Sequence, residues 1–136
     1  MSNIVYIGPA ESHPDVTEFP ASEVISPRQV LVVSSGAFAV AGADQGGMVY
    51  FALENVLGEV TEDYPVDETV QGARPQSGEY YEMALAAGQT IAKDDALTTD
   101  ASGNLVALGA GTNVIAYADE AVTTTGSAGS IRVYVK

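Results

Sequence analysis

The sequence predicts an all-β protein, a small β-barrel or β-sandwich with an extended N-terminal arm. From residue 29 onward, short runs of β-branched and small apolar residues alternate with Gly, Asp, Asn and Ser, which is the pattern of strands joined by tight turns. No segment carries a sustained helical periodicity. The best helix candidate, residues 51–60, is short, lacks a capping residue and contains Gly58.

The N-terminal arm is predicted over residues 1–30, which hold four of the six prolines. Each proline removes a backbone donor and biases its predecessor towards extended geometry, so no helix or interior strand is expected there. The arm is also more apolar than a solvated tail, and we expect its apolar side chains to be partner-contact anchors: Ile4, Val5, Tyr6, Ile7 and Phe19. The alternative is that residues 4–7 form an edge strand that completes the chain's own barrel.

Residues 31–136 are expected to form a single β domain. Its predicted strands are residues 30–33, 37–40, 48–53, 80–85, 89–97, 113–118 and 130–136. The run 89–97 is expected to bend at residues 93–95. In the last strand, alternation places Ile131, Val133 and Val135 inward and Arg132, Tyr134 and Lys136 outward.

Turn residues separate these strands at defined positions. Gly88 marks one turn, and Asp100 and Gly103 mark a hairpin in which Gly103 takes a positive φ. A calcium loop starting at Asp100 is excluded, because its sixth and twelfth positions would be Leu105 and Gly111 instead of Gly and Glu.

Composition argues against several classes of binding partner and catalytic site. The formal charge of −13 disfavours nucleic acid and anionic membranes as partners, and the absence of cysteine excludes thiolate nucleophiles and sulfur-ligated metals. His13 is the single histidine and lies in the arm, which is a poor platform for a catalytic pair. We therefore predict no enzyme activity, no catalytic residue, no cofactor and no metal site.

Acidic residues are concentrated in residues 54–82, which hold eight carboxylates against Arg74 alone. Such a block is typical of a solvated loop surface. Its alternative role is a patch that meets a basic partner and steers its association.

Two segments resemble the small capsid decoration, or cement, proteins of tailed bacteriophages. These are YFALENVLGEVTEDYPVDETV, residues 50–70, and GEYYEMALAAGQTIAKDDALTTDASGNLVAL, residues 78–108. The second carries the family's Ala-Gly-x-x-Ile stretch, its Asp-x-Leu and its Asp-x-x-Gly turn. One departure is Asp94, where the family often has Gly, and we expect a less sharp bend there. A similar rhythm occurs in lipoyl-type modules, which need a lysine on a tight hairpin, whereas Lys93 is expected inside a strand.

The resemblance implies a β-tulip-like barrel without enzymatic activity that binds the outside of an icosahedral head and stabilises the mature shell. The implied partners are the major capsid protein of the same virion and further copies of this chain, as a trimer first and a dimer second. The implied location is the outer capsid surface of a virion assembled in the host cytoplasm.

A second function, from a different class, is a virion-surface domain that binds a host glycan or protein receptor. Exposed aromatic side chains arranged as a platform would favour it, and the candidates are Tyr80, Tyr81, Tyr117 and Tyr134. Cross-strand packing is the structural alternative for these tyrosines.

Overall fold

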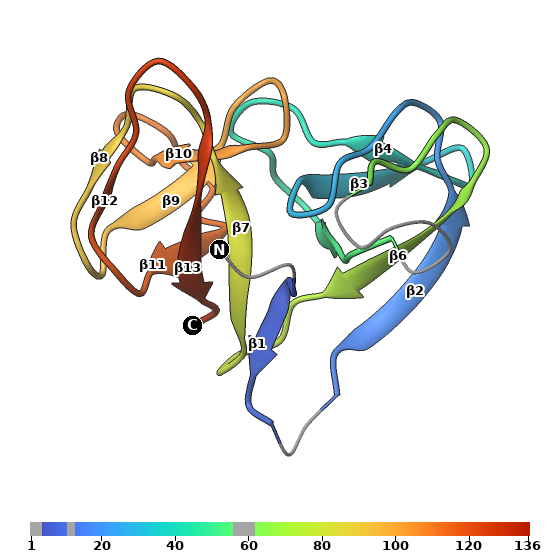
Figure 1. The fold of residues 1–136 in the computed structure, drawn as a ribbon, viewed down its shortest axis with the longest axis horizontal. Helices are drawn as coiled ribbons and strands as arrows, with labels where there is room; N and C mark the ends of the chain where they lie inside the picture. Colours follow the sequence, from blue (N-terminus) through green and yellow to red (C-terminus); the bar gives the residue numbers. More distant parts are fainter. Residues whose placement is uncertain (1–3, 11–12, 56–61) are drawn as a thin grey trace.

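A computed structural model of the chain describes residues 4–10, 13–55 and 62–136. All regular structure in this part of the chain is β-strand, which confirms the all-β prediction. The same residues contain no helix that is long and apolar enough to span a membrane. The strands form two adjoining units, a C-terminal barrel and an N-terminal sheet, with the long strand β7 between them (Figure 1).

The C-terminal barrel is a closed ring of five strands. Each is hydrogen-bonded to the next in the order β7–β13–β11–β9–β10, and β10 returns to β7 through a parallel pairing of Leu105 with Leu85. The strands are β7 (Tyr80–Leu85), β9 (Ala96–Thr99), β10 (Leu105–Ala107), β11 (Ala116–Ala118) and β13 (Gly129–Tyr134). Beside the ring, β8 (Thr90–Ile91) pairs with β12 (Val122–Thr123) as a short ribbon.

The N-terminal sheet is antiparallel, in the order β2–β6–β5–β3–β4. Its strands are β2 (Asp15–Pro20), β3 (Val30–Ser34), β4 (Ala37–Val40), β5 (Tyr50–Ala52) and β6 (Thr69–Arg74). The sheet curls so that the end of β2 approaches β4, where Ala21 and Phe38 form an isolated parallel bridge. Gly72 on β6 permits this curl, because a Cβ there would lie 2.6 Å from the Phe38 ring.

Two hydrophobic cores result from this arrangement. The larger core fills the barrel and its contact with the N-terminal sheet, so Phe51 of β5 packs edge-to-face on Tyr81 of β7, with ring centroids 4.9 Å apart. The smaller core lies within the curled sheet around Phe38 and Tyr64. The N-terminal sheet therefore contributes side chains to both cores.

The arm lies on its own chain in this structure. Strand β1 (Tyr6–Gly8) pairs antiparallel with β7, and β2 pairs with β6 over its full length. Both are edge strands of their sheets, in keeping with the proline-based prediction that no interior strand runs through residues 1–30. The described part of the arm thus completes the chain's own sheets, which is the alternative to an arm that contacts a partner.

Several local expectations need correction. The run 89–97 is two strands, β8 and β9, joined by a turn that contains Lys93 and Asp94. Asp94 has φ +72°, so it takes the backbone conformation that glycine favours and the bend remains sharp. Strand β5 lies within the predicted strand 48–53, and residues 56–60 of the helix candidate lie outside the described part.

The C-terminal turns follow the sequence-based expectation. Gly88 and Gly103 have φ of +75° and +74°. The Asp100 carboxylate accepts hydrogen bonds from the backbone N–H groups of Ser102 and Asn104, so Asp100 organises the hairpin between β9 and β10. The tip of this hairpin also joins the two units, because the N–H of Val30 donates to the carbonyl of Gly103 over 2.9 Å.

A second junction between the units is built on Asp44, in the loop after β4. Its Oδ1 accepts hydrogen bonds from the backbone N–H groups of Asn113 and Thr112, at 2.9 and 3.0 Å, and from the hydroxyl of Thr98. Its own N–H donates to the carbonyl of Thr99. Together with the hydrogen bonds that Thr99 makes to Gly42 and Gln45, Asp44 holds the loop after β4 on the barrel.

Candidate interaction surface

The most distinctive exposed feature is a row of three tyrosines across three neighbouring strands of the barrel. Tyr80 on β7 lies opposite Tyr134 on β13, and Tyr134 lies opposite Tyr117 on β11. The Tyr117 and Tyr134 rings are stacked with centroids 5.7 Å apart, and those of Tyr80 and Tyr134 are 6.2 Å apart. We call Tyr80, Tyr134 and Tyr117 the tyrosine ladder. Cross-strand packing therefore explains its geometry, yet Tyr80 remains 38% exposed.

Tyr81, the fourth candidate, belongs to the interior. It points to the opposite face of β7, is fully buried and contacts Tyr6 and Phe51 edge-to-face. Its hydroxyl donates to Oε1 of Glu79 over 2.8 Å. Burial, together with this carboxylate, raises the pKa of the Tyr81 phenol well above its usual range.

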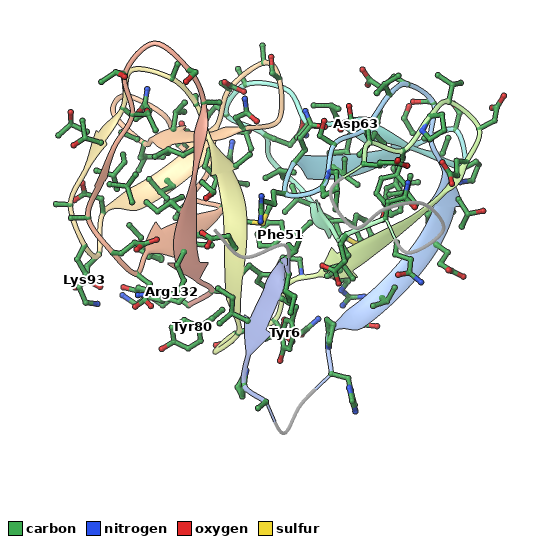
Figure 2. The ribbon with its side chains drawn as sticks, in the orientation of Figure 1. Tyr6, Phe51, Asp63, Tyr80, Lys93 and Arg132 are labelled. Atoms are coloured by element: carbon green, nitrogen blue, oxygen red, sulfur yellow. The ribbon has the colours of Figure 1, made fainter. Side chains whose placement is uncertain are left out.

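Charged residues surround the ladder. The Lys136 ammonium lies 5.2 Å from the centroid of the Tyr117 ring, within the range of a cation–π contact. The Tyr134 hydroxyl donates to Oδ1 of Asp94 over 2.8 Å, and Lys93 lies 3.4 Å from the same oxygen. Figure 2 shows Lys93, Arg132 and Tyr80 on the same side of the barrel.

One further carboxylate ties this charged set together. Asp119 accepts a hydrogen bond from Nε of Arg132 over 2.7 Å and lies 3.5 Å from Lys93. The hydrogen bond from Tyr134, followed by that from Lys93, lowers the pKa of Asp94 below its usual value. We call the ladder with these charged residues the ladder face; the added residues are Lys93, Asp94, Asp119, Arg132 and Lys136.

The five predicted arm anchors are divided by the structure. Val5 is fully buried in the larger core, and Tyr6 packs against that core. Phe19 packs on Phe38 of the smaller core, with ring centroids 5.3 Å apart. Ile4 and Ile7 are 58% and 43% exposed. Three of the five side chains thus serve the chain's own cores, and two reach the surface beside β7.

The acidic segment 54–82 is not one loop. It contains strand β6 and the start of β7, and Glu79 is only 5% exposed because its carboxylate binds the Tyr81 hydroxyl and the N–H of Gln76. Exposed carboxylates remain at Glu62, Asp63 and Asp67. The expectation of a solvated surface therefore holds for those residues but not for Glu79.

Lys93 lies in an exposed turn and not inside a strand, so its expected position is corrected. The turn is not the tight hairpin that a lipoyl-type module needs, because β8 pairs with β12 and β9 pairs with β10 and β11. The Lys93 ammonium is paired with two carboxylates, those of Asp94 and Asp119. His13 is exposed, as expected for the arm. Among residues 4–10, 13–55 and 62–136, no group of three or more His, Cys, Asp or Glu side chains could hold a metal ion.

Sequence reasoning missed how these parts come together. The alternation along β13 and the two residues after it places Arg132, Tyr134 and Lys136 outward, as predicted, and that signal identifies three of the eight residues of the ladder face. The pairing of β13 with both β7 and β11 is long-range and left no local signal. The Asp44 junction was also missed, since a single Asp after a strand resembles any turn residue.

Comparisons with known proteins give a fold but no family. No protein-family model matches the sequence, and no curated protein matches it. Among solved structures, the chain is similar to the N base of the head fibre gp8.5 of bacteriophage phi29, with a TM-score of 0.60 and 16% identity. The match covers 91% of this chain and 95% of that chain. The small barrel-containing all-β fold is therefore shared over nearly the whole of both chains.

Proposed function

We propose that this chain is a structural protein of a tailed-bacteriophage virion, a decoration protein that binds the outer surface of the head and stabilises the mature shell. The observation that carries the proposal is the likeness in fold to the base of a phage head fibre, over nearly the full length of both chains. The sequence resemblance to decoration proteins in residues 50–70 and 78–108 points in the same direction. The proposed partners are the major capsid protein of the same virion and further copies of this chain.

The chemistry of the surface supports a binding role over catalysis. Five titratable groups of the ladder face are paired with one another: Lys93 and Arg132 with Asp119, and Tyr134 with Asp94. Such pairs hold a fixed surface and leave no free acid or base beside a nucleophile. Many copies on one shell would turn weak individual contacts into firm attachment.

Cosedimentation tests this proposal. Purified protein mixed with undecorated heads is expected to sediment with the heads, and decorated heads are expected to resist heating better than bare ones, since binding to the mature shell stabilises that state by mass action. The shell should assemble without this chain. Protein that stays in the supernatant at saturating concentration, or heads that cannot assemble without it, would contradict the proposal.

Receptor binding is the second candidate, and the row formed by exposed Tyr80 with half-buried Tyr117 and Tyr134 favours it. A sugar ring stacks on a free aromatic face, whereas the Tyr117 and Tyr134 faces are turned towards each other and Lys136 lies over Tyr117. The surface is therefore better suited to a protein than to a glycan. Sedimentation with host cells or retention on immobilised oligosaccharide, without binding to heads, would select this second function.

A further inference from the structure

We infer that the ladder face is the surface through which two copies of this chain associate, around a twofold axis near Tyr134. The inference deepens the proposed function, on which it rests for the premise that the chain associates with itself. It names the contact surface, its chemistry and its symmetry.

The first ground is the chemistry of the exposed row. Tyrosine and arginine are enriched at the centres of protein interfaces, because each buries a large area and still satisfies polar groups. The ladder face offers three tyrosines and Arg132 on adjacent strands, fixed by cross-strand pairing and by the Arg132–Asp119 contact. A preorganised surface of this kind loses little side-chain entropy on binding.

The second ground is the distribution of charge. The chain has five Lys and Arg residues in total, and three of them, Lys93, Arg132 and Lys136, lie on the ladder face with Asp94 and Asp119. Two more carboxylates lie beside Arg132: Glu82 is opposite it in the β7–β13 register, and Glu120 accepts a hydrogen bond from its backbone N–H. All other parts of the sequence together hold two basic residues and fourteen acidic ones. Two copies with a charge of −13 repel each other over most of their surface, so close approach is least unfavourable at this face.

The mixture of signs on the face is also self-complementary. In a twofold contact the same patch is used on both copies, and residue i of one copy meets residue j of the other in both directions. The Lys136 ammonium, which lies over Tyr117, can then face Asp94 or Asp119 of the second copy, and the reverse pair forms by symmetry. Tyr134 is the middle residue of the ladder, which places it nearest the axis.

A second copy is therefore the occupant that the charge distribution of this face favours. A glycan is disfavoured by the mutual stacking of Tyr117 and Tyr134. A twofold contact builds a dimer, and the inference thus favours the dimer over the trimer that was expected first.

Native mass spectrometry at micromolar concentration tests the contact. The wild-type chain is expected to be a dimer, and Tyr134→Ser should raise the dissociation constant on the order of a hundredfold, because each contact loses two central rings. Lys136→Glu, at the exposed end of the chain, should weaken the dimer without touching either core. Val66→Ser is the matched control, since Val66 is 52% exposed and lies in the other unit, beyond the ladder face.

Cross-linking tests the symmetry, because the chain has no cysteine and any introduced thiol is unique. With a short bis-maleimide, Lys136→Cys is expected to link to its own copy in a second chain, whereas Met48→Cys, at an exposed position away from the ladder, should remain unlinked. Circular dichroism confirms that each variant is folded. If Tyr134→Ser does not fold, Lys136→Glu and the cross-linking decide the matter.

Three results would overturn the inference. These are a monomeric wild-type chain over the micromolar range, a dimer that survives both Tyr134→Ser and Lys136→Glu, and equal cross-linking of the two cysteine variants. A monomer that still sediments with heads would reject this inference and leave the proposed function intact. Retention of a monomer on oligosaccharide through Tyr134 would instead assign the face to a glycan.

Discussion

Replacing Gly103 with alanine tests how the β9–β10 hairpin joins the two units. A Cβ at residue 103 would lie 2.5 Å from Cγ1 of Val40 and 2.8 Å from the carbonyl oxygen of Val30. The backbone φ of +74° adds a separate penalty for any side chain. Gly88 is the matched control, because its φ is +75° and a Cβ there would have no atom within 4 Å.

The expected losses differ between the two variants. A left-handed backbone costs a non-glycine residue roughly 1–2 kcal/mol, so Gly88→Ala should lower the free energy of unfolding by about that amount. Overpacking adds typically about 1–3 kcal/mol, so Gly103→Ala should lose roughly 2–5 kcal/mol in total. Against a whole-domain stability on the order of 5–15 kcal/mol, this difference is measurable.

Urea unfolding followed by circular dichroism gives both free energies. Adding Val40→Ala to Gly103→Ala should recover part of the loss, because it removes the side-chain half of the clash and leaves the carbonyl of Val30 in place. Equal losses for Gly103→Ala and Gly88→Ala would refute the reasoning, since they would show that the hairpin tip does not press on the N-terminal sheet.

Three further outcomes follow from other contacts. Hydrogen bonds from the backbone N–H groups of Asn113 and Thr112 lower the pKa of Asp44. Its ionised form therefore stabilises the fold above about pH 4, and this contribution is lost as pH falls. Unfolding measured over a range of pH should show that Asp44→Asn destabilises the protein near neutral pH and that the difference from wild type shrinks in acid. The Tyr64 hydroxyl donates to the carbonyls of Leu53 and Glu54 at 2.8 and 2.9 Å, so Tyr64→Phe should lower the free energy of unfolding in urea by about 1–3 kcal/mol. Burial also raises the pKa of Tyr64 to about 12, so ultraviolet titration should find this phenol neutral at pH values where exposed tyrosines ionise. Deleting residues 1–28 removes β1, β2 and the core residue Ile25, so cooperative thermal unfolding should disappear, whereas a folded truncated domain would restore the detachable arm.

The strands that sequence reasoning located well are those whose pattern is local. Residues 80–85 alternate between the core and solvent and are bounded by Gly78 and Gly88, so β7 was predicted with its observed bounds. The hairpin at Gly103 was also predicted, because Asp and Gly at fixed spacing specify such a turn.

The parts that were missed depend on contacts between distant residues. Strand β6 lies in an acidic stretch and is recognisable only through its partners β2 and β5, which no local pattern specifies. The proline-rich segment is predicted as an extended arm with an edge strand as the alternative, since prolines are compatible with both. The ladder required the register of β13 against β7 and β11, which tertiary pairing alone determines.

Imaging heads by electron cryomicroscopy after incubation with the purified chain tests the central proposal most directly. The account predicts added density at repeated positions on the outer surface of mature heads, of a size and shape that fit the two adjoining β units, and none on heads kept without the chain. Heads that remain bare at saturating concentration, or density confined to the interior, would contradict it.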